Sequence, residues 1–306
     1  MIFSLLNTNL FPCPRTHKYH FDKFSLGFIQ NGYTYLEVSN LESILLLGEE
    51  DILYISNHFS CDFTHRLFKK QLQDKLFDYL SRSVCKIIFW NFHTTFDTSA
   101  WKEFSGRSIH LGEDMDQEYL KSEDVLVKFQ SQYDIYRLKY SSSHEIKPRY
   151  EQERKFDFQF VGSNYKSEWT KYCDQKYNSF VRITPPAINE IERINSYQKS
   201  KINLVFHSEA NIKKGIIVER FAEAISLGGI IFHDHPKISK LFPNVESFFY
   251  IKSVEDIEKN HQYINSLQVD EIAALRKASR ECWEMSELSY QKQASSILER
   301  LGAVNE

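Results

Sequence analysis

The chain has 306 residues, of which 42% are hydrophobic and 26% are charged, and its formal net charge is −3. This composition is that of an ordinary globular protein, and the length suits about two domains. The small negative charge argues against a dedicated nucleic-acid-binding protein, which usually carries a strongly basic face. No apolar run approaches the ~20 residues that a membrane-spanning helix needs.

The five cysteines lie far apart and form no Cys-x-x-Cys pair. An odd number of scattered cysteines excludes a disulfide scaffold and a zinc knuckle, and is typical of a reducing compartment. The first residues, Met1 to Leu6, lack the basic start and the small-residue cleavage site of a secretion signal. We therefore expect a cytoplasmic protein without a transmembrane segment.

Short apolar segments in the first half alternate with one helical segment. The expected strands are 2–6, 51–57 and 86–92, and the expected helix is 63–80, where apolar residues recur at close to the helical period. A strand, a helix and a further strand indicate a βαβ unit with a parallel sheet. The polar segment 141–154 is interpreted as a linker, so that residues 1–150 form a first, Rossmann-like domain.

The second half alternates strands and helices more regularly. The expected strands are 156–161, 180–183, 202–207, 229–233 and 247–251. The expected helices are 167–176, 188–200, 216–227, 254–266, 269–285 and 289–301. Gly228 and Gly229 follow the third of these helices and form a typical helix-stop signal. The pattern predicts a doubly wound α/β domain over residues 151–306 with a C-terminal helical tail.

One segment of the second half combines cations, carboxylates and glycine. The strand 202–207 leads into a polar loop and then into a helix, with these residues in order: Lys213, Lys214, Gly215, Glu219, Arg220 and Glu223. Backbone N–H groups at a helix N-terminus attract an anion, and the lysines and the arginine add positive charge. Glu219 and Glu223 are four residues apart and face the same side, where a carboxylate can accept both hydroxyls of a ribose. The segment therefore predicts a site for a nucleoside diphosphate.

The same segment carries a family resemblance. Arg220-Phe-Ala-Glu223-Ala-Ile-Ser-Leu-Gly228-Gly229, followed by an apolar strand, resembles the Arg-x-x-Glu-Ala-x-Ala-x-Gly-Gly signature of CgeB-like glycosyltransferases, relatives of the glycosyl transferases of group 1. Phe160-Val161-Gly162-Ser163 resembles the Phe-Val-Gly-Ser loop at the start of that family's donor domain. The resemblance covers about residues 155–300. It implies the GT-B fold, in which two Rossmann-like domains face across a cleft: an acceptor-side domain over 1–150 and a nucleotide-sugar donor domain over 151–306.

The resemblance also implies roles for the matching residues. Glu223 would bind the nucleotide ribose, and Gly162 would let the backbone approach the phosphates. Arg220 and Lys166 would neutralise the diphosphate leaving group. Where the larger family has a sugar-binding glutamate eight residues before the ribose glutamate, this chain has Gly215, which leaves the donor sugar open. Such enzymes generally hold the diphosphate with cationic side chains, so we expect no metal and no cofactor beside the nucleotide-sugar co-substrate.

A second resemblance leads to a different stereochemistry. Val218-Glu219-Arg220 resembles the Thr-Glu-Lys motif of α1,3-fucosyltransferases, and Ser163-Asn164 resembles their Ser-Asn loop. Those enzymes invert configuration and use a guanine nucleotide. Both resemblances imply the same fold and a positive charge at Arg220, but the CgeB-like one implies retention.

Polar residues also follow other predicted strands, at the sheet edge where α/β proteins bind ligands. His93 and Asp97 follow the strand 86–92, and either suits a general base if the reaction inverts. His207 ends the strand 202–207 and is interpreted either as a donor contact or as a structural histidine. The run His233-Asp234-His235 resembles a metal cluster, but no third ligand is evident, so a cleft lining is the favoured interpretation.

These features predict a glycosyltransferase that moves a sugar from a nucleotide-diphosphate sugar donor to an acceptor hydroxyl, as in polysaccharide biosynthesis. The acceptor is a glycan, a lipid-linked glycan, a protein or a modified nucleic-acid base, and the net charge disfavours the last. A non-catalytic protein that binds a nucleotide sugar or a glycan, and a Rossmann-like enzyme with another nucleotide ligand, stay open as alternatives. The predicted binding residues are Gly162, Ser163, Lys166, His207, Lys214, Glu219, Arg220 and Glu223. The predicted catalytic residues are Asp97, His93 and Arg220.

Overall fold

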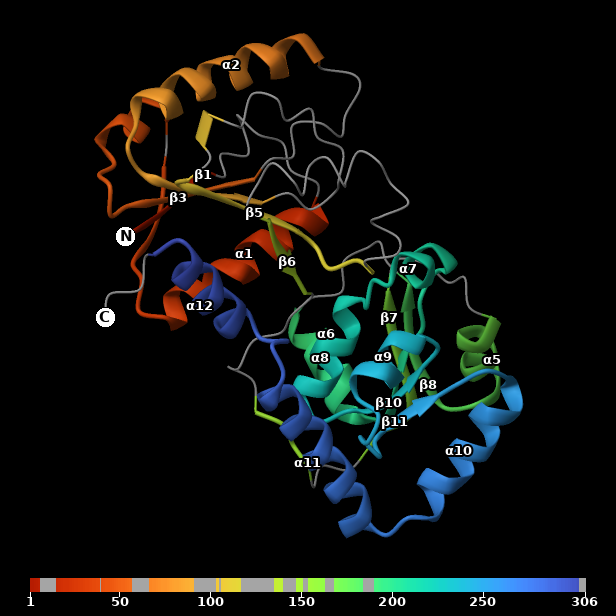
Figure 1. The fold of residues 1–306 in the computed structure, drawn as a ribbon. Helices are drawn as coiled ribbons and strands as arrows, with labels where there is room; N and C mark the ends of the chain where they lie inside the picture. Colours follow the sequence, from red (N-terminus) through yellow and green to blue (C-terminus); the bar gives the residue numbers. More distant parts are fainter. Residues whose placement is uncertain are drawn as a thin grey trace. The chain divides into compact units, whose positions relative to one another are not determined.

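The computed structural model divides the chain into two compact units (Figure 1). Unit 1 consists of Met1–Lys139 with Tyr290–Glu306, and unit 2 of Tyr140–Ser289. The structure describes residues 1–5, 15–38, 40–56, 66–90, 103–104, 106–116, 135–139, 147–150, 154–162, 168–183 and 190–302. These are called the described residues below, and each unit is described by itself.

Unit 1 contains a parallel sheet of six strands among its described residues. Its elements are β1 (Ile2–Leu5), α1 (Arg15–Gln30), β2 (Tyr35–Glu37), the 3₁₀ helix η1 (Glu42–Leu46), β3 (Ile52–Ser56), α2 (Arg66–Arg82), β4 (Lys86–Trp90), β5 (Ser108–Glu113), β6 (Ile135–Leu138) and α12 (Tyr290–Arg300). The strand order is β2-β1-β3-β4-β5-β6, and all neighbours are parallel. The order reverses at β1, as in doubly wound sheets.

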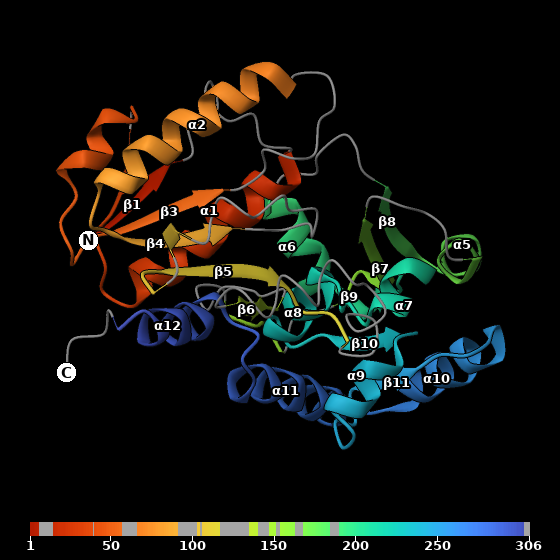
Figure 2. The same ribbon diagram turned by 45° about the horizontal axis from the view of Figure 1, so that its top comes forward.

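Helices cover both faces of the unit 1 sheet (Figure 2). On one face, α2 packs over apolar strand residues that include Leu53 and Phe89. On the other face, Phe28 of α1 packs against Tyr54 with the ring centroids 5.4 Å apart and the rings nearly perpendicular. Burial of both faces explains why these strands read as nearly continuous apolar runs in the sequence.

The last helix, α12, packs on α1 of unit 1, so the two ends of the chain share one core (Figure 1). Gly27 permits the close approach, because a Cβ at this position would lie 2.3 Å from the carbonyl oxygen of Tyr290. The side chain of Gln293 bonds both the N–H and the carbonyl of Lys139, each at 2.8 Å. These contacts tie α12 to the residue that follows β6.

Unit 2 contains a parallel sheet of five strands among its described residues. Its elements are β7 (Phe156–Gly162), α5 (Glu168–Lys176), β8 (Ser179–Ile183), α6 (Glu190–Lys199), β9 (Ser200–Val205), α7 (Glu209–Lys214), α8 (Glu219–Ser226), β10 (Ile230–His233), α9 (Pro236–Leu241), β11 (Phe248–Tyr250), α10 (Val254–Ser266) and α11 (Val269–Met285). The strand order is β11-β10-β9-β7-β8, with all neighbours parallel. This order is also a doubly wound one, and it reverses at β7.

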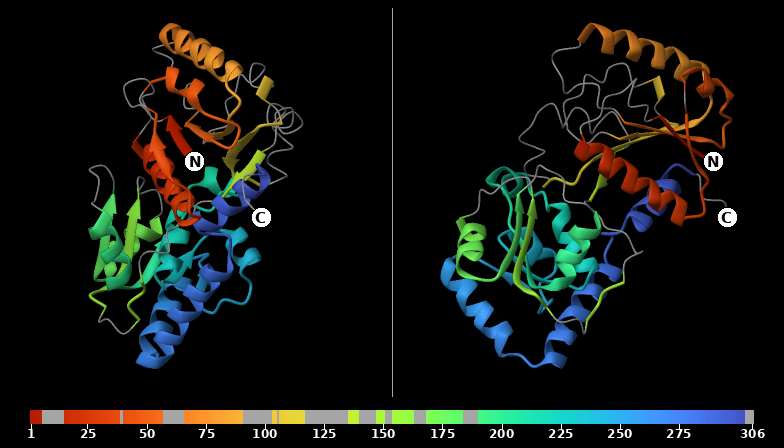
Figure 3. Two further views of the ribbon diagram at one scale, coloured as in Figure 1. Left: turned by 90° about the vertical axis from the view of Figure 1, so that its left-hand side faces the viewer. Right: turned by 180° about the vertical axis from the view of Figure 1, so that it is seen from behind.

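Alternate residues of each unit 2 strand enter two separate cores. Ile202 and Leu204 of β9 pack on the side of α5 and α10, whereas Val205 packs on the side of α6 and α8. The right panel of Figure 3 shows α5 and α10 on one side of the strands and the helices of the second core on the other. The period of two in a strand produces this division.

The prediction of an α/β chain with Rossmann-like parallel sheets is confirmed. The predicted helices 254–266 and 269–285 coincide with α10 and α11. The segment expected as a loop after β9 contains the short helix α7, and the next helix starts at Glu219 rather than at 216. The pattern does not predict α1, β2, β5, β6 or α9. In the described part of the chain, no helix combines the length and the apolar character needed to cross a bilayer.

Candidate functional site

The candidate site lies in unit 2, where β7 and β9 end side by side. β7 pairs with β8 on one side and with β9 on the other, so the chain leaves β7 and β9 toward opposite faces of the sheet. Open parallel sheets bind ligands beyond the carboxyl ends of their strands at such a reversal. β7 ends at Gly162 and β9 ends at Val205, which Phe206 and His207 follow.

The guanidinium of Arg220, on the first turn of α8, spans these two strand ends. Its Nη2 donates to the carbonyl of Phe206 at 2.8 Å, and its Nη1 lies 3.5 Å from the carbonyl of Val161. The guanidinium carbon is 4.7 Å from the centre of the Phe160 ring, a cation–π distance. Burial lowers the pKa of Arg220 from its usual value, but an arginine stays charged at neutral pH. A fixed positive charge therefore lies at the reversal point.

Gly162 provides the space that Arg220 occupies. A Cβ at this position would lie 2.5 Å from Nη1 of Arg220 and 3.0 Å from Cζ of Phe160. A side chain at residue 162 and the guanidinium would compete for one volume. The absence of a side chain at residue 162 therefore leaves room for the guanidinium of Arg220. The sequence pattern does not indicate this role of Gly162.

The N-terminus of α8 lacks a side-chain cap among the described residues. Val218 is its N-cap residue, and valine is a poor N-cap because it has no oxygen to offer the first-turn amides. The N–H of Val218 donates instead to Nε2 of His207 at 3.3 Å. A helix N-terminus carries a partial positive charge, which adds to that of Arg220. Both features favour an anion at this end of α8.

Glu223, one turn further along α8, is only 9% exposed and forms an ion pair with Arg193 of α6. The buried Tyr197, also on α6, has no hydrogen-bond partner for its hydroxyl among the described residues. Burial and, after it, the charge of Glu223 raise the pKa of Tyr197 well above its usual value. The carboxylate that the sequence assigns to the ribose is therefore held by a cation from a neighbouring helix.

Both ring nitrogens of His207 are engaged within the protein. Its Nδ1 lies 2.7 Å from Oδ1 of Asp234, and its backbone N–H donates to both carboxylate oxygens of Asp234 at 3.1 and 3.0 Å. Because a carboxylate only accepts, Nδ1 carries the proton, and Nε2 accepts from Val218. The side chain is fully buried, and burial lowers the pKa of His207, which keeps the imidazole neutral.

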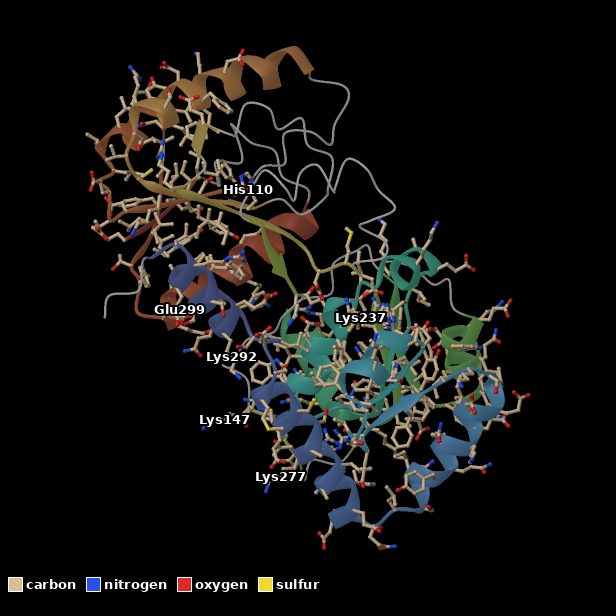
Figure 4. All side chains as sticks on the ribbon, in the orientation of Figure 1. His110, Lys147, Lys237, Lys277, Lys292 and Glu299 are labelled. Atoms are coloured by element: carbon tan, nitrogen blue, oxygen red, sulfur yellow. The ribbon has the colours of Figure 1, made fainter. Side chains whose placement is uncertain are left out.

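The structure places the other predicted residues as follows. Glu219 is the first residue of α8, and Lys214 is the last residue of α7, whose C-cap is Gly215 at φ 68°. Lys237 of α9, labelled in Figure 4, donates from Nζ to the carbonyl of Gly215 at 2.8 Å. Four predicted residues lie outside the described residues: Asp97, His93, Ser163 and Lys166.

The run His233-Asp234-His235 begins at the last residue of β10, and Asp234 and His235 contact His207. The ring of His235 lies 4.7 Å from that of His207, and its Nδ1 accepts the N–H of Lys237 as the N-cap of α9. Burial lowers the pKa of His233 and of His235 to about 4 each. Across the described ranges, no group of three or more His, Cys, Asp or Glu side chains is arranged to hold a metal ion.

Three residues of the site escape the sequence patterns: Arg193, Tyr197 and Lys237. Arg193 and Tyr197 are four residues apart on α6, so one face of a predicted helix presents both. That spacing is the signal that the sequence offers for this pair. Nothing in the sequence indicates that this face meets Glu223, which is 30 residues away along the chain.

Residues 144–299 match the model of a family described as glycosyl transferase-like. The match extends over slightly more than half of the chain and includes β7, α6, β9 and α8, which build the site. A search of curated proteins finds no match to the chain.

Proposed function

The chain belongs to the glycosyl transferase-like family, and on this basis we propose that it transfers a sugar from a nucleoside-diphosphate sugar to an acceptor hydroxyl. One observation carries the proposal: the guanidinium of Arg220 bridges the ends of β7 and β9, where doubly wound sheets bind ligands. A cation at that point suits the diphosphate of such a donor.

Arg220 and the N-terminus of α8 would act on the leaving group. As the bond between the sugar and the diphosphate breaks, negative charge grows on the diphosphate oxygens. Positive groups that are already in place stabilise this charge without reorganising. The ring of Phe160 and the carbonyl of Phe206 hold the guanidinium in advance. Because the interaction strengthens in the transition state, loss of Arg220 should depress turnover more than donor binding.

Glu223 would bind the ribose of the donor. It lies three residues after Arg220 on α8, so the two side chains are neighbours on the helix surface. A carboxylate can accept both hydroxyls of a ribose, and Arg193 pairs with Glu223 in this largely buried position. The proposed pose therefore has the diphosphate at Arg220 and the ribose at Glu223.

The finer features of the proposal rest on the motif resemblances. They are a GT-B arrangement with unit 1 on the acceptor side, the nucleotide sugar as co-substrate without a further cofactor, and retention of configuration. The CgeB-like signature at Arg220–Gly229 supports retention, whereas the fucosyltransferase-like motif supports inversion with a guanine nucleotide. The anomer formed first in the reaction, followed by proton NMR, decides between them.

Nucleotide release from UDP-, GDP- and dTDP-sugars, together with calorimetric binding of UDP and GDP, tests the proposal. We expect Arg220→Met to lower turnover by about 100-fold or more, and Glu223→Gln to weaken nucleotide binding by roughly 10- to 100-fold. Arg280→Met is the matched control. Arg280 also lies over an aromatic ring, that of Trp283, and donates to a carbonyl, that of Ser226, but at the opposite end of α8.

Each outcome of this experiment has a defined meaning. Turnover that requires Arg220 but not Arg280 supports a transferase. Nucleotide binding without turnover of any donor indicates a non-catalytic binding protein instead. A chain that binds no nucleotide, or variants that bind and turn over like the parent, would refute the assignment of the site.

A further inference from the structure

We propose that His207, held by Asp234, is a positioning residue that sets the N-terminus of α8 and through it the guanidinium of Arg220. The effect on nucleotide binding rests on the proposed function, but the structural effect on α8 does not. His207 is buried and both of its ring nitrogens bond within the protein, so its role is exerted through the helix.

Asp234 fixes the position and the tautomer of His207. The carboxylate accepts the backbone N–H of His207 with both oxygens and accepts Nδ1–H with Oδ1. A hydrogen bond at one ring nitrogen determines which nitrogen carries the proton. Nε2 is consequently left with its lone pair, which points to the N–H of Val218 at 3.3 Å.

The end of β9 holds the first turn of α8 at two adjacent points. The carbonyl of Phe206 accepts from Nη2 of Arg220, and the imidazole of His207 accepts from the N–H of Val218. The side chain of Val218 accepts no hydrogen bond from the first turn in the described part of the chain, and the imidazole of His207 bonds one amide at this end of the helix, the N–H of Val218. A shift of α8 along its axis would break both contacts together.

The segment after β10 supports the same loop from outside. Asp234 holds His207, and Lys237, three residues later, donates to the carbonyl of Gly215, which precedes α8. The ring of His235 packs against that of His207. Lys237 thus anchors the start of the connection between α7 and α8 directly, and Asp234 anchors its end through His207.

Protonation of His207 should release the helix. The titratable and charged groups that face the imidazole, among the described residues, are Asp234, His233, His235 and Arg220. A proton on Nε2 removes the acceptor for Val218 and adds a second cation next to Arg220. Burial lowers the pKa of His207, so this release begins below the usual histidine range.

Two substitutions separate the roles of the two ring nitrogens. His207→Gln places an amide oxygen near the position of Nε2, and His207→Asn places an amide near the position of Nδ1. We expect the Asn variant to bind UDP or GDP at least about tenfold more weakly, because the contact to Val218 is lost. The Gln variant should bind within about threefold of the parent, and it should lack the fall in affinity that we expect of the parent at a pH below the usual histidine range.

Control variants and a second measurement distinguish a folding defect from a loss of positioning of α8. His261 of α10 is a mostly buried histidine of the same unit with Asp157 as its carboxylate neighbour at 3.6 Å, away from α8. His261→Gln and His261→Asn should leave nucleotide affinity unchanged. Thermal unfolding shows whether each variant folds, and Asp234→Asn, which retains the size of the side chain, should act like His207→Asn.

Hydrogen exchange of the backbone amides at 218–222, measured without nucleotide, tests the helix directly. These amides should exchange at least about tenfold faster in His207→Asn than in His207→Gln. Equal exchange in the two variants, or equal affinity losses in both, would overturn the positioning role. If the parent chain binds no nucleotide, the proposed function fails, whereas the exchange measurement still decides whether His207 holds α8.

Discussion

Gly162→Ala tests the arrangement of the site with a single methyl group. The added Cβ would lie 2.5 Å from Nη1 of Arg220, whereas ordinary contacts between such atoms begin near 3.4 Å. The guanidinium must therefore move by about 1 Å. Such a shift stretches its 2.8 Å hydrogen bond to the carbonyl of Phe206 beyond useful length.

The expected magnitude follows from the hydrogen bond that the displaced guanidinium could no longer donate to the diphosphate of a bound nucleotide. Hydrogen bonds of charged groups contribute about 1.5–3 kcal/mol, which corresponds to roughly 10- to 150-fold in the affinity for UDP or GDP. Residue 162 has no positive φ, so alanine brings no backbone strain there. The loss of flexibility in the unfolded chain favours alanine by about 0.4–1 kcal/mol. We therefore expect a loss of nucleotide affinity of roughly 10- to 150-fold. The free energy of unfolding should fall by about 0.5–2.5 kcal/mol, because the lost hydrogen bond to Phe206 outweighs the gain from alanine.

Calorimetric titration and urea unfolding measure the two quantities, with Gly48→Ala as the control. At Gly48 the nearest atom to an added Cβ is Oδ2 of Asp51 at 3.9 Å, so this variant should be neutral. In an Arg220→Ala background, Gly162→Ala should weaken binding little further, because the displaced group is absent. Additive effects of the two substitutions would show that Gly162 acts by some route other than Arg220.

Three further predictions concern the stability of unit 2. Arg276 is 1% exposed and donates to the carbonyls of Gly228, Ser200 and Lys201. Arg276→Met should therefore lower the free energy of unfolding, measured in urea titrations, by about 2–4 kcal/mol. A change below about 1 kcal/mol would contradict this role of Arg276. Gly229→Ala should lower it by about 2 kcal/mol or more, since the new Cβ would lie 2.7 Å from the carbonyl oxygen of Ala224, a backbone atom that cannot rotate away. His233 and His235, with pKa values of about 4, are neutral when folded, and the unfolded chain binds protons on them from about pH 6.5 downward. The free energy of unfolding should then fall as the pH is lowered from about 6.5 to 4, by up to about 3 kcal/mol for each histidine. A free energy of unfolding that stays constant over that range in urea titrations would show that the two histidines are not buried in the neutral form.

Features that depend on neighbours in the chain could be predicted from the sequence. The helices α10 and α11 begin where local caps require: Ser253 Oγ accepts the N–H of Asp256 at 3.3 Å, and Glu271 accepts the N–H of Gln268 at 2.7 Å. The stop of α8 is local as well. Gly228 adopts φ 67° and, like Gly229, donates its N–H back into the last turn, to Ile225 and Ala224 respectively.

Elements whose stability comes from remote packing could not be predicted. Gly27 weakens the intrinsic helical preference of α1, yet the same glycine lets α12 approach from the other end of the chain. The helix α7 has only six residues, and besides its local caps, Ser208 and Gly215, it is held by the bond from Lys237 to the carbonyl of Gly215. Helices this short are stabilised mainly by their tertiary contacts, and the hydrophobic periodicity of the sequence does not reveal those contacts.

The candidate site divides in the same way. The sequence determined that Arg220 and Glu223 share one side of a helix that follows a strand and a polar segment, because three residues make almost one helical turn. Only the tertiary structure decided what each side chain meets. Val161 and Arg220 are 59 residues apart, His207 and Asp234 are 27 apart, and each pair meets because the strand order sets β7, β9 and β10 side by side. Strand order depends on the packing of the whole unit, and it brings the partners of Arg220 and His207, which are distant in the sequence, into contact with them.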